Sequence, residues 1–145
     1  MALHLIKLCV GADSIRDLQD WIKERLAEKR RKKQPPEHIH TTRMMPTRAD
    51  ELLDGGSLYW VIRGEIACRQ ALIDIREYKD KEGVRRCQLV LNSNVVPVMP
   101  RPRGPFQGWR YLNGKDAPGD LTRGAKGIAK LPEEMRRELR ELGLL

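Results

Sequence analysis

The chain has few aromatic residues and no long apolar run. Only 5% of its 145 residues are Phe, Tyr or Trp, and Phe106 is the single phenylalanine. No stretch approaches the roughly 20 apolar residues that a membrane-spanning helix needs. The N-terminal MALHLIKLCV has no basic leader before its short apolar run. We therefore expect neither a signal peptide nor a membrane partner.

Cysteine is also scarce. Cys9, Cys68 and Cys87 form an odd set, and each lies in an apolar or alternating run. This pattern is typical of reduced thiols on strands and not of a disulfide framework. We therefore expect a cytoplasmic protein.

The usual catalytic signatures are missing as well. The sequence contains no GxxxxGK[ST], GxGxxG, GxSxG, HExxH or CxxC motif. Acid or base groups exist in His38, His40, Glu51 and Asp74, but no spacing brings a nucleophile to a base. We therefore predict no catalytic residue and no cofactor.

What the chain does have is positive charge. It carries 28 Lys and Arg against 20 Asp and Glu, which gives a net charge of +8 and a pI near 9.7. This balance favours an acidic partner, with nucleic acid first and a phospholipid surface second. The alternative is that the charge serves solubility alone.

The N-terminal third predicts a strand and a helix. Residues 1–10 read as a largely buried strand that ends at Gly11. Ser14 and Asp17 have capping-box spacing, and an apolar stripe then follows at helical intervals, formed by Ile15, Leu18, Ile22 and Leu26. The prolines at 35 and 36 must stop this helix.

The densest positive run lies at the end of that helix and consists of Arg30, Arg31, Lys32 and Lys33. Cations at a helix C-terminus are stabilised by the helix dipole, which is sufficient to explain them. The functional alternative is an auxiliary contact to phosphate groups.

Residues 37–45 look extended, with His38 and His40 on one face of the strand. Two histidines could begin a metal site if His4 or Cys68 came near. Two ligands are too few to define one, so we expect no metal and interpret this face as the polar rim of a cleft that is auxiliary to binding.

The stretch from His40 to Gln70 looks like the architectural centre. Residues 46–53 predict a short helix ended by Asp54-Gly55-Gly56, and Gly64 suits the tip of a hairpin. The run between them predicts a central strand with one core face, formed by Leu58, Trp60 and Ile62.

The second half predicts further strands and a closing helix. A hairpin joins residues 71–78 to 84–91, and residues 95–99 predict a further strand, which Pro97 limits to an edge or a bulge. Residues 100–112 look irregular and residues 113–130 look like a long surface loop. A helix then begins at Pro132 and presents Met135, Leu139 and Leu142 inward.

The segment PRPRGPFQGWRYL interleaves arginines with aromatic rings. Guanidinium groups neutralise phosphate oxygens, and flat rings stack on bases for roughly 1 to 3 kcal/mol each. Alternatively, Phe106 and Trp109 only cap one end of a barrel. Arg43 and Arg48 would extend the surface if the short helix packs beside this segment. The candidate binding residues are Arg43, Arg48, Arg101, Arg103, Trp109, Arg110 and Tyr111.

Two blocks, RMMPTRADELLDGGSLYWVI and PFQGWRYL, resemble a family of short bacterial proteins known only as a domain of unknown function. The resemblance covers nearly the whole chain and implies no activity. A weaker resemblance, in the order of helix 46–54, Gly55-Gly56 and strand 58–63, is to the PUA-like β-barrels, including the ASCH and EVE groups. These commonly bind RNA or modified bases.

We therefore expect one α+β domain over residues 1–145, a small mixed, mostly antiparallel, partly closed barrel flanked by N- and C-terminal helices. It is taken as a monomer by default. The leading hypothesis is a module that binds RNA or a modified nucleotide. The alternatives are a small enzyme acting on a nucleotide-like or other anionic metabolite, favoured by a deep closed pocket containing His38, His40 or Glu51, and a protein-interaction module that uses the proline-rich segment.

Overall fold

The computed structural model describes residues 2–121 and 133–141. Within these residues the chain forms seven strands, three α-helices and one short 3-10 helix. In chain order the elements are β1 (Leu3–Leu8), α1 (Ile15–Arg31), β2 (His38–Thr42), α2 (Ala49–Leu52), β3 (Ser57–Ile62), β4 (Glu65–Lys79), β5 (Arg85–Leu91), β6 (Val96–Pro102), β7 (Trp109–Asn113), η1 (Gly114–Asp116) and α3 (Glu133–Glu141).

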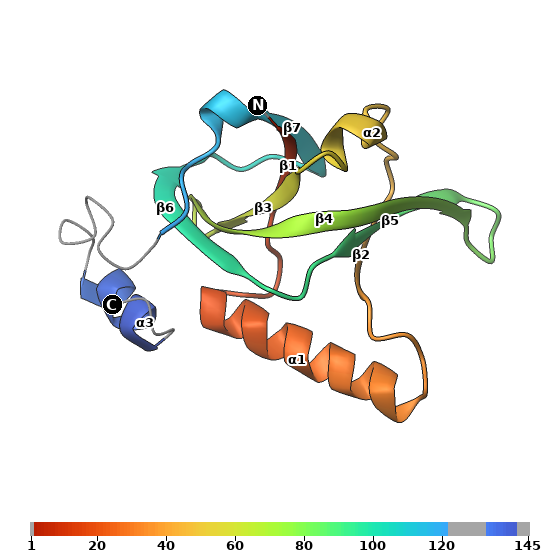
Figure 1. Ribbon diagram of the computed structural model, residues 1–145, viewed down its shortest axis with the longest axis horizontal. Helices are drawn as coiled ribbons and strands as arrows, with labels where there is room; N and C mark the ends of the chain where they lie inside the picture. Colours follow the sequence, from red (N-terminus) through yellow and green to blue (C-terminus); the bar gives the residue numbers. More distant parts are fainter. Residues whose placement is uncertain (1, 122–132, 142–145) are drawn as a thin grey trace.

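The strands form one mixed, mostly antiparallel sheet, which confirms the predicted α+β class (Figure 1). Its order is β2-β5-β4-β3-β1-β7, and β6 pairs with β4 outside this path. The β1–β3 ladder is parallel, and the other ladders are antiparallel. In the described part of the chain no ladder joins β2 to β7, so the sheet is open.

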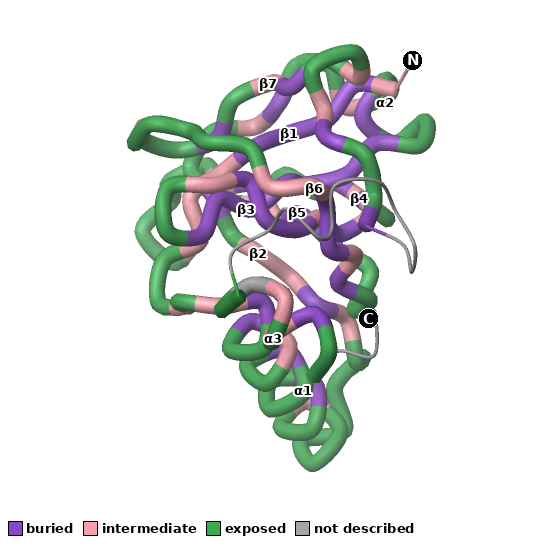
Figure 2. Tube along the Cα trace, turned by 90° about the vertical axis from the view of Figure 1, so that its left-hand side faces the viewer, coloured by how far each residue is buried: buried purple, intermediate pink, exposed green. Residues whose placement is uncertain are grey.

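Strand β3 lies inside the sheet, as its sequence predicts. Its alternation divides the core: Leu58, Trp60 and Ile62 pack in one cluster with the apolar stripe of α1. Tyr59 and Val61 pack on the opposite face in a second, smaller cluster. All six residues of β3 are buried, and Figure 2 shows the buried strands above the exposed outer side of α1.

Helix α1 begins and is held as its capping box indicates. Ser14 Oγ accepts a hydrogen bond from the backbone N–H of Asp17 (3.1 Å). Glu138 of α3 then accepts from the backbone N–H groups of Ile15 (2.7 Å) and Arg16 (3.2 Å), which places α3 against the start of α1 (Figure 1). Leu139 on α3 is buried as predicted.

Two features differ from the sequence predictions. The hairpin residues after Gly64 and the strand at 71–78 form one continuous strand, β4, whose register shifts at a bulge between Leu72 and Asp74. Residues 109–113, expected to be irregular, form β7 because they pair with β1. The predicted edge position of the Pro97 strand is confirmed in β6. Half of the predicted 113–130 loop, residues 122–130, and Leu142 lie outside the described residues.

The three cysteines are free thiols, and Cys68 and Cys87 are buried. Burial raises the pKa of Cys9 to about 11. Among the helices of the described residues, none combines the length and apolar character that crossing a bilayer requires.

Candidate functional site

A hollow of about 400 Å³ lies where the two end strands of the open sheet come near each other. Both end strands contribute to its wall, β2 from one side and β7 from the other. The lining residues are Lys7, Thr41, Thr42, Arg43, Met44, Arg86, Gln107, Gly108, Trp109 and Arg110.

The carbonyl of Met44 ties the two sides together. It accepts hydrogen bonds from Trp109 Nε1 (2.8 Å) at the start of β7 and from Thr42 Oγ1 (3.2 Å) at the end of β2. These two bonds fix the turn that follows β2. The backbone at Arg43 is therefore restrained, and Arg43 lines the same hollow as Arg110.

Tyr111 makes a second link, between β7 and the start of α2. Its hydroxyl oxygen accepts from the backbone N–H groups of Thr47 (3.1 Å) and Arg48 (3.3 Å). The N-terminus of α2 has no side-chain cap of its own, so the phenol satisfies donors that the short helix leaves unpaired. Helix α2 thus packs beside the end of the PRPRGPFQGWRYL segment, which was the condition for Arg48 to extend the candidate surface.

The hollow is positively charged. Among the residues that line it are four cations and no carboxylate. Arg86 is partly neutralised, because its Nε lies 2.7 Å from Asp80 Oδ2. Lys7, Arg43 and Arg110 make no ion pair with any part of the chain that the structure describes.

Three of the seven candidate binding residues meet here, namely Arg43, Trp109 and Arg110. Arg48 and Tyr111 lie next to each other, with the guanidinium 5.5 Å from the ring centroid, but neither lines the hollow. Arg48 is also paired with Glu51 (Nη2 to Oε1 2.8 Å), and this hydrogen bond holds the pKa of the Glu51 carboxyl below its usual value.

Arg101 and Arg103 are not part of the hollow. Arg101 Nη1 donates to the carbonyl of Asp116. Arg103 lies over the Phe106 ring, 4.9 Å from its centroid, and its backbone N–H bonds to the Gly64 carbonyl. Pairing of β6 with β4 carries both arginines to the β3–β4 hairpin instead.

Trp109 does not offer the open stacking surface that its sequence context suggested. Its side chain is only 8% exposed and packs in the larger core cluster. Its ring meets Tyr111 edge to face at 4.9 Å between centroids. The cause is the pairing of β7 with β1, which turns Trp109 and Tyr111 toward the core face and leaves Trp109 as the floor of the hollow.

Sequence reasoning missed Lys7 and Arg86. Lys7 belongs to a strand that reads as buried, and it reaches the hollow because it is paired with Trp109 across the β1–β7 ladder. The available signal was the break that Lys7 makes in an apolar strand. Arg86 had no distinguishing signal beyond its position in an alternating hairpin strand.

The auxiliary candidates divide into two groups. His38, His40 and Lys32 line a second hollow, between α1 and β2, while Arg30, Arg31 and Lys33 are exposed and absent from its lining. His38 is only 4% exposed, and it borders this hollow together with His40. Burial, aided by nearby cations, lowers the pKa of His38 and of His40 to about 4.

Within the described residues, no group of three or more His, Cys, Asp or Glu side chains is placed to hold a metal ion. His38 and His40 are on the same strand face, as their spacing predicts. His4, the third histidine considered, lies on the opposite face of the sheet, where its ring packs against Tyr59 (4.9 Å between centroids).

Comparison with known proteins gives a family and no activity. No curated protein matches the chain. No solved structure matches it either. One family, described as "Protein of unknown function (DUF1489)", matches residues 5–145, nearly the whole chain, including both sequence blocks that the resemblance rested on. The chain therefore belongs to the DUF1489 family of proteins of unknown function.

Proposed function

We propose that this protein binds RNA or a modified nucleotide, with a phosphate group held in the hollow between β2 and β7. The observation that carries the proposal is the convergence of Lys7, Arg43 and Arg110 on one hollow that no carboxylate lines. Cations without a carboxylate partner attract phosphate. The charge of a paired cation is largely offset by its carboxylate, so its attraction for phosphate is weaker.

The contrast with the other arginines supports this choice of site. Arg16, Arg63, Arg69 and Arg76 each lie within 3.1 Å of a carboxylate oxygen. Their charges are largely compensated by these carboxylates and add little to the electrostatic field around the protein. The candidate hollow is thus a place where the net charge of +8 remains available to a partner.

The dimensions of the hollow suit a single nucleotide unit better than a long stacked strand. At about 400 Å³ it falls within the usual range of small-molecule pockets. Thr41 and Gln107 add hydroxyl and amide groups able to hydrogen-bond a sugar or a base edge. Because Trp109 is buried, we propose that the arginines supply most of the affinity and that stacking supplies little.

The resemblance to PUA-like barrels in a cytoplasmic bacterial protein forms part of the same proposal. An open sheet whose end strands are tied by side-chain bonds, Trp109 to Met44 above all, is compatible with a partly closed barrel. Such barrels commonly bind RNA or modified bases, and we propose the same class of ligand for this chain.

The test is a titration with single-stranded RNA, and in parallel with single-stranded DNA, at several salt concentrations. The double variant Arg43→Gln with Arg110→Gln should bind more weakly. The slope of log K against log salt should fall by about 1.4, because each lost contact to a single strand is worth roughly 0.7.

The matched control is Lys23→Gln with Arg137→Gln, which removes two exposed charges from α1 and α3, away from the hollow. It should leave the slope nearly unchanged. An absence of binding by the unaltered protein at low salt, or equal losses in both double variants, would rule out the hollow as a phosphate site.

The enzyme alternative has less support. A general base works best with a pKa near the operating pH, whereas the pKa of His38 and of His40 is about 4. Glu51 and Asp74, the other candidate groups, are engaged by Arg48 and Arg76. We therefore propose binding ahead of catalysis.

A further inference from the structure

The hollow between α1 and β2 is a separate feature from the proposed phosphate site, although Thr41 borders both. It encloses about 430 Å³. Its walls are the C-terminal half of α1, the start of β2 and one residue of β5. The residues that matter for its chemistry are Arg25, Glu28, Lys29, Lys32, Glu37, His38 and His40.

A chain of buried hydrogen bonds fixes which nitrogen of His38 carries the proton. Trp60 Nε1 can only donate, so the Gln70 oxygen must face it (2.9 Å). The Gln70 amide nitrogen then donates its two hydrogens to the carbonyl of Asn92 (2.8 Å) and to His38 Nδ1 (3.0 Å). Nδ1 is therefore the acceptor, and neutral His38 bears its hydrogen on Nε2.

That Nε2–H donor has no partner. Among the described residues, His38 Nε2 and His40 Nε2 are both buried nitrogens without a hydrogen bond. An unpaired buried donor costs about 1 to 3 kcal/mol, so such a group calls for an acceptor. His38 is only 4% exposed, and it is one of the residues that line the hollow.

The charges around the hollow decide what kind of acceptor fits. Three cations line it, Arg25, Lys29 and Lys32. Of its two carboxylates, Glu28 is paired with Lys32 (3.0 Å). The other, Glu37, is held by Arg76 of β4 (Nη2 to Oε2 2.8 Å), which also bonds Asp74.

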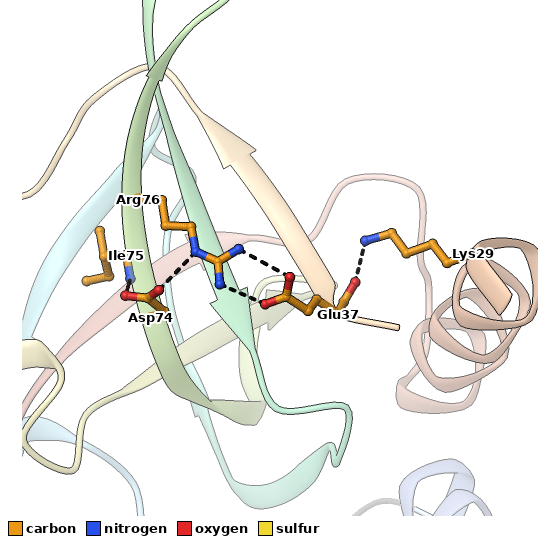
Figure 3. A network of polar contacts seen from close by, with 5 residues as sticks. All are labelled: Lys29, Glu37, Asp74, Ile75 and Arg76. Carbon is orange, nitrogen blue, oxygen red and sulfur yellow. Dashed lines mark hydrogen bonds and ion pairs between the residues drawn. The ribbon is translucent and has the colours of Figure 1, made fainter. Parts of the chain in front are cut away.

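Figure 3 shows this arrangement. The guanidinium of Arg76 lies between Asp74 and the carboxylate of Glu37, and Lys29 reaches from α1 to the backbone carbonyl of Glu37. The Glu37 carboxylate is thus satisfied from the β4 side. The hollow keeps a positive balance beside the two imidazoles.

We propose that the hollow between α1 and β2 is a binding site for a small oxyanion, whose oxygen accepts the hydrogen of His38 Nε2 while Arg25 and Lys29, the lining cations without an ion pair among the described residues, balance its charge. A phosphate and a carboxylate share this chemistry. The site is independent of the proposed RNA contact, because Arg43 and Arg110 take no part in it.

The test observes the imidazoles directly by NMR of protein labelled with ¹⁵N in histidine. The three histidines give few signals. At neutral pH His38 should show the neutral form protonated at Nε2. Titration with orthophosphate, and separately with citrate, should shift this resonance saturably in the millimolar range or below, and the tighter of the two identifies the oxyanion.

Matched variants make the test specific. Arg25→Gln with Lys29→Gln should weaken the saturable shift at least about tenfold, the effect of losing one charge-assisted contact. Lys23→Gln with Arg30→Gln removes two charges from the same helix outside the hollow and should change it little. Arg43→Gln with Arg110→Gln should leave it intact, even if RNA binding is lost.

Three results would overturn the proposal. His38 could be protonated at Nδ1 instead. Neither anion could produce a saturable shift, which would mean that the hollow holds water only. Finally, both α1 double variants could weaken the shift equally, which would show that the helix charge as a whole, and not the hollow, attracts the anion.

Discussion

Gln70 is a fully buried polar side chain whose three hydrogen bonds join β3, β2 and the turn after β5. Gln70→Leu keeps much of the volume but leaves Trp60 Nε1, the Asn92 carbonyl and His38 Nδ1 unpaired. We expect a loss of about 3 kcal/mol in the free energy of unfolding, measured by urea denaturation. Gln107→Leu, at an exposed position, is the control; equal effects would contradict the role given to the network.

The buried His38 and the half-buried His40 make stability depend on pH in acid. Their pKa is about 4 in the folded protein against 6.5 for an exposed histidine. Between these values the unfolded chain binds more protons, so stability is intact above about pH 6.5 and falls as pH drops toward 4. The maximal loss is on the order of 3 kcal/mol per histidine.

Urea denaturation at a series of pH values measures this dependence. The double variant His38→Gln with His40→Gln should start with lower stability but show a flatter curve between pH 6.5 and 4. If its curve keeps the slope of the unaltered protein, the carboxylates and not these histidines set the acid sensitivity.

At the scale of elements, the turn between α2 and β3 contains two glycines with different tasks. A Cβ on Gly56 would lie 2.2 Å from the Leu52 carbonyl oxygen and 2.4 Å from that of Leu3, so backbone would have to move. Gly55 has a positive φ of 86° but space around it, with Ala2 Cβ 4.0 Å away.

We therefore expect unequal effects from the same substitution. Gly56→Ala should cost more than about 3 kcal/mol, because it forces packed backbone apart. Gly55→Ala should cost about 1 to 2 kcal/mol, the strain of a left-handed residue. Thermal denaturation of the two variants compares them, and a larger loss for Gly55→Ala would refute the close approach at Gly56.

Local patterns were enough to predict the elements whose contacts are local. Three such features are recognisable from residues close together in the sequence: the capping residue Ser14, the apolar stripe of α1 and the alternation of β3. All three are present in the structure. Strand β7 could not be predicted in this way, because what makes it a strand is pairing with β1, more than a hundred residues earlier.

The same distinction holds for the candidate site. Arg43 and Arg110 could be proposed from their neighbours in sequence. The burial of Trp109 depends on the face of β7, which only the β1 register decides, and the inclusion of Lys7 follows from that register too. The inward turn of His38 likewise depends on Gln70, which is 32 positions away.

For the molecule as a whole, the hydrogen bond from Trp109 of β7 to the Met44 carbonyl, just after β2, links the two ends of the open sheet, and its contribution can be tested. Trp109→Phe keeps the apolar contacts but removes the donor to the Met44 carbonyl. We expect the amides of β7 to exchange with solvent roughly fivefold faster, as the loss of about 1 kcal/mol implies, while those of β3 stay protected.

Hydrogen exchange followed by NMR or mass spectrometry gives the measurement. Trp21→Phe, which alters a half-exposed ring on α1 (43% exposed), is the control and should leave β7 unaffected. Uniform acceleration over all strands in Trp109→Phe would mean that the indole supports global stability and not the joining of the two sheet ends.

The position of β1 has a consequence for the order of events during synthesis. It leaves the ribosome before the other strands of this sheet, yet its partners are β3, some fifty residues later, and β7, about a hundred residues later. Long loops must close before either ladder can form. We therefore expect the β3–β4–β5 hairpins to fold first on the nascent chain, while β1, with its run of apolar side chains, waits without a partner until β3 and finally β7 have been made.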